Sequence, residues 1–236
     1  MPPRPTSPRV LKHVLTVLDG PTRRSLIVES NDGIIATAGV VEGFAGAGWT
    51  GPPLVLGALF SMVAGGLALG GMRYAEEEAE RDARRALIAE EREQLARSPQ
   101  QELEELAEIY EAKGLSAPLA WQVALELSAR DPLAAHIEAE HQFALGDQPF
   151  APLIIGLGAA LAYALGAAIP LLAVLLAPDE WRGWVTVVAA AVGLILTSIL
   201  LARMGVRSIR RSTARTLAVA GVAGGMTLLV GWLLDV

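Results

Sequence analysis

Four long apolar stretches constrain this chain more than any other feature of its sequence. They are residues 54–74, 151–177, 184–202 and 217–234. Each is apolar over roughly the 20 residues that an α-helix needs to cross the hydrocarbon layer of a membrane. Apolar residues make up 53% of the chain, which also argues against an ordinary soluble protein. The sequence therefore predicts an all-α protein that crosses a membrane several times.

A fifth stretch, residues 25–48, is apolar but contains several polar side chains. These are Glu29, Asn31, Asp32 and Glu42. Such a stretch can be a soluble amphipathic helix, but residues 34–41 are all apolar or small except for one threonine. We therefore interpret residues 25–48 as the first of five membrane spans, one with a polar lining.

The basic residues are distributed as five spans require, because lysine and arginine accumulate in short cytoplasmic loops. Five basic residues precede the first predicted span, and five arginines lie between residues 203 and 215, before the last span. The turn at residues 49–53 carries no basic residue, and the turn at residues 177–183 carries one arginine. This alternation predicts a cytoplasmic N-terminus and a cytoplasmic segment between the second and third spans. Arginine outnumbers lysine 17 to 2, which favours a bacterial source and hence the cell inner membrane.

The polar segment between the second and third spans carries most of the acidity of the chain. Residues 75–148 hold 18 acidic and seven basic side chains, a net charge of −11, whereas the whole chain has −6. So acidic a segment excludes nucleic acid as a partner. The chain contains no cysteine, which excludes disulfides and thiolate metal sites. The predicted organisation is a tail at 1–24, spans one and two at 25–74, a cytoplasmic domain at 75–148, and spans three to five at 149–236.

Proline and glycine residues divide the acidic segment into helices. No proline occurs in residues 67–97, so the second span is expected to continue out of the membrane as one long helix. Ser98, Pro99 and Gln101 then provide an N-cap, a first helical residue and a capping-box partner for a second helix. Gly114 ends that helix, residues 116–118 begin a third, and residues 131–132 kink it or begin a fourth.

Carboxylates and an imidazole recur at helical spacing in this segment. Glu102 and Glu105 share one helix face, and His136 and Glu140 share another. Oxygen and nitrogen ligands that converge from facing helices suit divalent cations such as Mn²⁺, Fe²⁺ and Ca²⁺. The same spacing is also typical of a solvated, charged helix face, so the spacing alone leaves both interpretations open.

Two carboxylates in the first predicted span form a second candidate site. Asp32 begins its apolar part, and Glu42 follows ten residues later. Carboxylates within a membrane by default mark an ion path or a proton relay. The alternative is that Asp32 caps a helix at the membrane surface and that Glu42 reaches the outer surface. Small residues are dense at 43–48 and 64–71, which permits close helix packing within a protomer or across a dimer.

The order of the motifs resembles the vacuolar iron transporter family over nearly the whole chain. The matching motifs are SNDGII, EER followed by SPQQELEELAEIYEAKGL, DPLAAHIEAEH, GAAIPLL and RSIRRSTARTLAVAG. The resemblance implies a five-span homodimer in a lipid bilayer, in which the second span runs into a cytoplasmic metal-binding domain. It further implies movement of Fe²⁺, and in some members Mn²⁺, out of the cytosol, in several cases in exchange for protons.

The resemblance also implies where metal ligands lie. The glutamates of the family's metal-binding domain and the aspartate of its membrane path fall on Glu91, Gln94, Glu102, Glu105, Glu140 and Asp32. A methionine pair of the family is matched by His136 and Ile137, and we expect His136 to act as a ligand. The sequence departs from the family at Gln94, which replaces a glutamate. It also departs at Leu69, in place of a path methionine, and at Arg73, in place of a glutamate.

The sequence therefore predicts a transporter that exports Fe²⁺, Mn²⁺ or both from the cytosol by proton antiport, with no prosthetic group. Its predicted metal ligands are Asp32, Glu91, Glu102, Glu105, His136 and Glu140. The departures in span two motivate an alternative, a membrane-anchored metal buffer or sensor. An enzyme is not expected, because a ferritin-like site needs two Glu-x-x-His motifs, and only Glu138 with His141 forms one.

Overall fold

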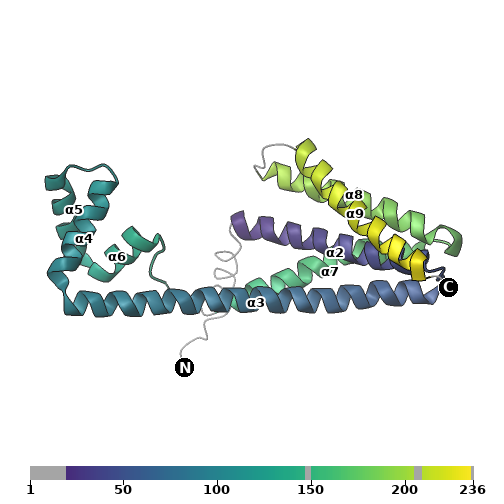
Figure 1. Cartoon of the computed structure of the whole chain (residues 1–236), viewed down its shortest axis with the longest axis horizontal. Helices are drawn as coiled ribbons and strands as arrows, with labels where there is room; N and C mark the ends of the chain where they lie inside the picture. The colour runs from purple at the N-terminus through teal and green to yellow at the C-terminus, as the bar shows by residue number, and fades with distance from the viewer. Residues whose placement is uncertain (1–19, 147–149, 205–208, 235–236) are drawn as a thin grey trace, which may run out of the picture. The chain divides into compact units, whose positions relative to one another are not determined.

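The structure is a computed structural model that describes residues 20–146, 150–204 and 209–234. Of the tail predicted at 1–24, residues 1–19 lie outside the described residues, as does the domain boundary predicted at residue 148, whereas residues 20–24 belong to the first described helix. Eight α-helices and one short 3₁₀-helix make up the described chain, which contains no strand (Figure 1). The elements are α2 (Gly20–Gly46), α3 (Pro52–Arg97), α4 (Pro99–Ala112), α5 (Ala117–Arg130), α6 (Pro132–His141), α7 (Ala151–Leu176), η1 (Asp179–Trp181), α8 (Arg182–Arg203) and α9 (Ile209–Leu234). The prediction of an all-α protein is confirmed.

The helices form two compact units. The membrane unit comprises the described residues within Met1–Ala75 and Phe150–Val236, and the acidic unit comprises those within Glu76–Pro149. Helix α3 runs without a break for 46 residues and contributes to both units. That length is more than twice the roughly 20 residues that cross a bilayer, so α3 continues far beyond its apolar part. The sequence predicted this continuation from the lack of proline.

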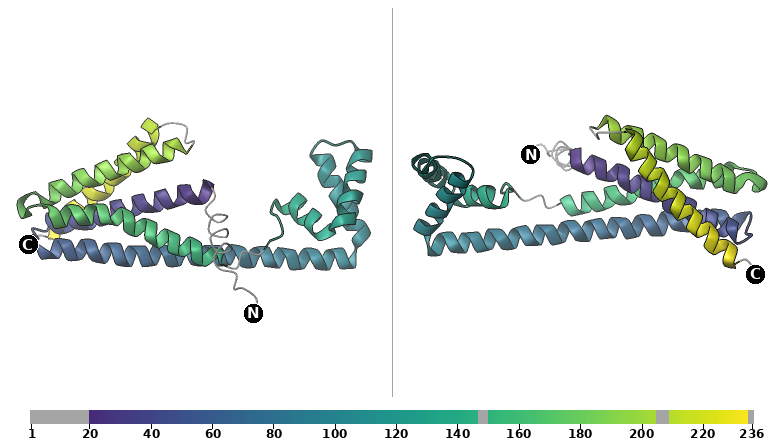
Figure 2. Two further views of the ribbon diagram at one scale, coloured as in Figure 1. Left: turned by 180° about the vertical axis from the view of Figure 1, so that it is seen from behind. Right: turned by 45° about the horizontal axis from the view of Figure 1, so that its top comes forward.

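Four of the described helices are long and apolar enough to cross a membrane. They are α3, α7, α8 with the preceding η1, and α9. The predicted first span corresponds to α2 and is not among these four, since α2 carries Glu29, Asp32 and Glu42 along its length. Helix α2 nevertheless packs against α7, α8 and α9 (Figure 2). The membrane unit therefore surrounds its most polar helix with apolar ones.

Glycines bring α2 and α7 into backbone contact. A Cβ atom at Gly33 of α2 would overlap the carbonyl oxygen of Tyr163, and one at Gly166 of α7 would overlap the carbonyl oxygen of Ser30. Small residues at helix interfaces allow this approach in membranes. Next to this contact, Ile34 packs with Leu194 in an apolar cluster that joins α2 to α8.

The acidic unit is a small helical bundle with its own apolar core. Leu106 and Ala107 of α4 pack with Ala124 of α5 and with Ala135 and Ala139 of α6. As predicted, new helices begin after Ser98 and Ser116, and of the two outcomes expected at residues 131–132 the structure shows a new helix after Asp131. The Asp131 carboxylate caps α6 by accepting a hydrogen bond of 3.0 Å from the backbone N–H of Ala134.

The capping box expected at Ser98 is wrong. Ser98 is the N-cap residue of α4, but its side chain makes no capping hydrogen bond. Its backbone instead continues the helical hydrogen bonding, because its N–H donates to Gln94 at 2.9 Å and its carbonyl accepts from Glu102 at 3.1 Å. Pro99 at the start of α4 has no N–H to satisfy there. The turn from α3 into α4 is therefore made mainly by the backbone.

We expect Gly166→Ala to destabilise the membrane unit, because the new methyl group forces α2 and α7 apart. Overpacking of this kind typically costs about 1–3 kcal/mol. The midpoint of thermal unfolding of the purified protein in detergent should fall. Gly71→Ala is the matched control, since no atom lies within 4 Å of the position that its Cβ would take. Equal midpoints for the two variants would contradict the packing described for α2 and α7.

Candidate metal centre

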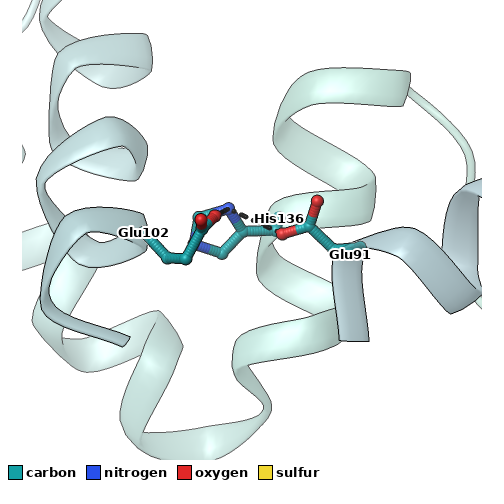
Figure 3. A group of neighbouring side chains, drawn as sticks. All are labelled: Glu91, Glu102 and His136. Atoms are coloured by element: carbon teal, nitrogen blue, oxygen red, sulfur yellow. Dashed lines mark ion pairs between the residues drawn. The ribbon is translucent and has the colours of Figure 1, made fainter. Parts of the chain in front are cut away.

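Three helices bring two carboxylates and an imidazole together in the acidic unit. Glu91 lies near the end of α3, Glu102 in the first turn of α4, and His136 in the middle of α6. The chain turns at Ser98 and Pro99 between α3 and α4, and the carboxylates of Glu91 and Glu102 both lie near the His136 ring of α6 (Figure 3). Figure 3 shows the three side chains pointing into the space between the helices.

The ligand atoms of these residues, here called the Glu91–Glu102–His136 cluster, lie close enough to share one ion. His136 Nδ1 lies 3.1 Å from Glu91 Oε1 and 3.8 Å from Glu102 Oε2. The three ligand atoms all lie within 4.8 Å of one another. The exposed fractions of Glu91, Glu102 and His136 are only 2%, 6% and 1%. Solvated charged faces do not bury their carboxylates in this way, so this part of the acidic segment is not such a face.

Two of the three side chains are buried without hydrogen bonds. Within the described chain, Glu91 Oε1 and both ring nitrogens of His136 have no hydrogen-bond partner. The short distance between Glu91 and His136 therefore lacks the geometry of a hydrogen bond. A buried polar group without a partner typically costs about 1–3 kcal/mol. A divalent cation bound between these atoms would accept their lone pairs and remove that cost.

The electrostatics of the cluster favour a cation. Burial and, to a smaller extent, the negative charges of Glu102, Glu140, Glu105 and Glu90 together raise the pKa of Glu91 to about 7. These five carboxylates create a strongly negative potential around one buried oxygen. A bound divalent cation would neutralise more of this negative charge than a single proton on Glu91 does.

A second group of ligating atoms shares Glu91 with the cluster. Glu91, Glu140 and His141 place one atom each within 4.8 Å of one another. Here Glu140 is exposed and His141 is half-buried, with 3.8 Å between His141 Nε2 and Glu140 Oε2. The sequence did not single out His141 as a ligand. Its position directly after Glu140, at the end of α6, was the available signal.

The other predicted ligands lie apart from the cluster. Glu105 is exposed on α4, one turn after Glu102, and belongs to neither group of converging ligand atoms. Gln94 is exposed on α3. Asp32 lies in the membrane unit, where it is exposed on α2 and belongs to no group of three ligating side chains in the described residues. The roles of Asp32 and Glu105 stay predictions.

The membrane unit holds an ion pair between α3 and α2 that the sequence did not indicate. Arg73 Nε of α3 donates to Glu29 Oε1 of α2 at 2.9 Å. Ser25 Oγ also donates to Glu29 Oε1, at 3.1 Å, and accepts from Arg73 at 3.2 Å. Glu29 is one helical turn before Asp32 and is only 2% exposed. Arg73 therefore places a fixed positive charge one turn from the predicted ligand of the membrane path.

Comparison with known proteins identifies the family. A model of the VIT family matches residues 23–232, which is most of the chain. The chain belongs to the VIT family. The resemblance inferred from the sequence motifs is thereby confirmed. A vacuolar iron transporter of Acanthamoeba castellanii (strain ATCC 30010 / Neff) is 28% identical over 223 residues, which cover 93% of this chain and 74% of that protein.

The VIT family match and the four candidate spans together indicate a multi-pass membrane protein. The match extends from α2 to α9, so it includes the Glu91–Glu102–His136 cluster as well as the spans. In this VIT family member, the buried cluster lies in a unit separate from the candidate membrane path on α2.

We expect the affinity for Mn²⁺ to rise with pH up to about 7 and then to level off. Below its pKa of about 7, Glu91 is protonated in the metal-free protein, so an ion must displace that proton. One displaced proton changes the affinity about tenfold per pH unit below that value. Isothermal titration of the full-length protein in detergent, repeated across this range, measures the effect.

Glu91→Gln removes the titrating group and should both weaken binding and flatten its pH dependence. Glu111→Gln, which changes an exposed carboxylate of α4, is the matched control and should behave like the parent. If Glu91→Gln keeps the full pH dependence, a group other than Glu91 controls binding.

Histidine substitutions separate the two groups of ligand atoms. His136→Ala removes the buried imidazole of the cluster, and we expect Mn²⁺ affinity to fall by about 10–100-fold or more, since even residues that only support metal ligands have effects of that size. His141→Ala should have the smaller effect, because its partner Glu140 is exposed. The same titration measures both variants. The opposite ranking would assign the ion to Glu91, Glu140 and His141.

Proposed function

We propose that this protein is a divalent-metal transporter that exports Fe²⁺, Mn²⁺ or both from the cytosol in exchange for protons. The observation that carries the proposal is the buried Glu91–Glu102–His136 cluster, in which converging oxygen and nitrogen atoms lack hydrogen bonds. Membership of the VIT family and similarity to a vacuolar iron transporter support metal-ion transport. In this proposal the metal ion is the cargo, and the protein needs no prosthetic group.

The proposed topology has five spans, with α2 as the first. Helix α2 is 27 residues long, enough to cross a bilayer, and it packs on three of the four candidate spans. Its polar side chains Glu29, Asn31, Thr37 and Glu42 are buried within the membrane unit. The buried polar groups of α2 and the distribution of basic residues support five spans in the cell inner membrane. In this topology the N-terminus and the acidic domain at 75–148 are cytoplasmic.

The chemistry of the cluster supports Fe²⁺ or Mn²⁺ as the cargo. One imidazole with two carboxylates offers a mixed nitrogen and oxygen ligand set. Imidazole suits iron and other transition metals, whereas Ca²⁺ and Mg²⁺ prefer oxygen ligands alone. The cluster would capture the ion at the cytoplasmic side and raise its concentration near the membrane path.

Asp32 is the proposed ligand of that membrane path. It is exposed on α2 of a single subunit, whereas Glu29, Asn31, Thr37 and Glu42 of the same helix are buried. An exposed carboxylate within a membrane is costly unless another surface covers it. We propose that a second copy of the chain covers it, so that the transporter is a homodimer. The glycine-rich segments of α2 and α3 are largely used within one subunit, where Gly46 packs against α9 and Gly65 and Gly70 pack against α7, so the proposal of a dimer rests on Asp32.

One observation favours a second candidate function, a membrane-anchored metal buffer or sensor. Arg73 already neutralises Glu29, one turn from Asp32, and Leu69 supplies no ligand atom. A fixed cation at this position repels an arriving metal ion. In that case the acidic unit would bind metal, but nothing would cross the membrane.

Metal flux into proteoliposomes tests the proposal. We expect the parent protein to transport Fe²⁺ or Mn²⁺, and Asp32→Asn to reduce the rate by about tenfold or more while leaving metal binding by the acidic unit unchanged. Asp82→Asn, which removes an exposed carboxylate of α3, is the matched control. If Asp32→Asn transports both metals as fast as the parent, the assignment of the path to Asp32 is wrong. Binding by the parent without flux would instead support the buffer or sensor.

A further inference from the structure

Glu42 is a buried carboxylate that neither the cluster nor the proposed path uses. It lies on α2 and is only 8% exposed. Its Oε1 atom is buried and has no hydrogen-bond partner in the described residues. Gly183, near the start of α8, faces this oxygen: a Cβ atom at Gly183 would lie 3.9 Å from it. The carboxylate therefore points from α2 toward the start of α8.

Glu42 lines two cavities of the membrane unit. The inner cavity has a volume of about 290 Å³ and is lined by α2, α8 and α9. The end cavity has a volume of about 460 Å³ and is lined by the loops that follow α2 and α7. The end of α2 and the starts of α3 and α8 lie at the same end of the membrane unit in every view (Figures 1 and 2). Glu42 therefore lies between the inner cavity and the end of the membrane unit where α3 and α8 begin.

The walls of the inner cavity are apolar apart from Glu42. They include Ile35, Ala38, Val187, Ala190 and Leu217. A divalent metal ion needs several oxygen or nitrogen ligands, commonly about six for ions such as Mg²⁺. The inner cavity offers a single carboxylate. A proton, by contrast, needs only one oxygen atom, and its binding removes the charge that the apolar walls disfavour.

The charged groups that share the end cavity with Glu42 are few. Arg182 is held by Asp179, with 2.5 Å between Nη1 and Oδ1, and its Nε donates to the carbonyl oxygen of Ala177 at 3.3 Å. Glu180 is exposed at the rim. Helix α9 contributes Leu228 and Trp232 to this cavity, and α3 contributes Leu54, so none of the described lining residues of α9 or α3 is charged. No described cation pairs with Glu42.

We propose that Glu42 is a proton-binding site of the membrane unit, reached by water through the end cavity. A hydronium ion transfers its proton to a carboxylate oxygen of Glu42, which leaves a neutral carboxylic acid and a water molecule. Release reverses this step. The site rests on the proposed function, because it supplies the counter-ion of the exchange. Glu42 follows Asp32 by ten residues, or about 15 Å along α2, so the proton site is separate from the proposed metal path.

Infrared difference spectroscopy tests the site without any transport. We expect the metal-free parent in lipid to develop a carbonyl band of a buried carboxylic acid when the pH is lowered. Glu42→Gln should lack that band, and Glu180→Gln, which removes an exposed carboxylate at the same end, should keep it. Glu42→Asp retains a carboxylic acid and should show the carbonyl band at a shifted frequency. This variant replaces Glu42→Gln in the test if Glu42→Gln does not fold. Superimposable spectra of the parent and Glu42→Gln would overturn the proposal.

Flux in proteoliposomes tests the coupling. An imposed proton gradient should accelerate metal movement by the parent but not by Glu42→Gln, which should retain exchange of metal without a gradient. Gradient stimulation that persists in Glu42→Gln would contradict the role in coupling. If the parent moves no metal at all, the proposed transport function fails, and the infrared result alone decides whether Glu42 binds a proton.

Discussion

The hydrocarbon of a bilayer offers no hydrogen bonds, and the arrangement of the membrane unit follows from that constraint. Helix α2 carries the polar groups, so it packs against α7, α8 and α9 and directs these groups inward. Glu29 pairs with Arg73, the Asn31 amide oxygen accepts from Thr197 at 2.5 Å, and the hydroxyl groups of Thr37 and Ser61 lie 3.1 Å apart. Glu29 Oε2 and Glu42 Oε1 are both buried without a hydrogen-bond partner, but Glu29 is paired with Arg73 through its other oxygen, whereas Glu42 lines two cavities and has no paired cation among the described residues. Burying the polar face of α2 away from the hydrocarbon thus leaves the Glu42 carboxylate available to bind a proton.

In the acidic unit, too, the environment of each polar side chain depends on whether water can reach it. Most of its glutamates are exposed and solvated, some in ion pairs within one helix, such as Glu80 with Arg84 and Glu93 with Arg97. Glu91 and His136 differ because both are buried, and Glu91 Oε1 and the two ring nitrogens of His136 have no hydrogen-bond partner among the described residues. Such a site lowers the stability of the metal-free unit and favours binding of a cation. Capture of metal in the acidic unit and proton binding at Glu42 would then be two separate functions of one chain.

Local sequence signals predicted the helices, and tertiary contacts decided the sites. The unbroken α3, the helix starts at Ser98 and Asp131, and the polar α2 all follow from proline placement and hydropathy. The sequence also placed Glu102 and Glu105 on one helix face, but it did not determine that only Glu102 turns inward. That outcome depends on how α4 rotates against α6, which helical spacing does not encode. The pair of Glu29 with Arg73 likewise joins residues 44 positions apart, beyond the reach of any local pattern.

The central claim is that the Glu91–Glu102–His136 cluster binds the transported ion through both oxygen and nitrogen. X-ray absorption spectroscopy at the metal edge of the full-length protein, loaded with one equivalent of Mn²⁺ or Fe²⁺, tests this directly. We expect a first shell of oxygen and nitrogen ligands with the outer-shell scattering of one imidazole, and we expect this scattering to be lost in His136→Ala. Spectra without imidazole scattering, identical in the parent and in His136→Ala, would contradict binding through His136.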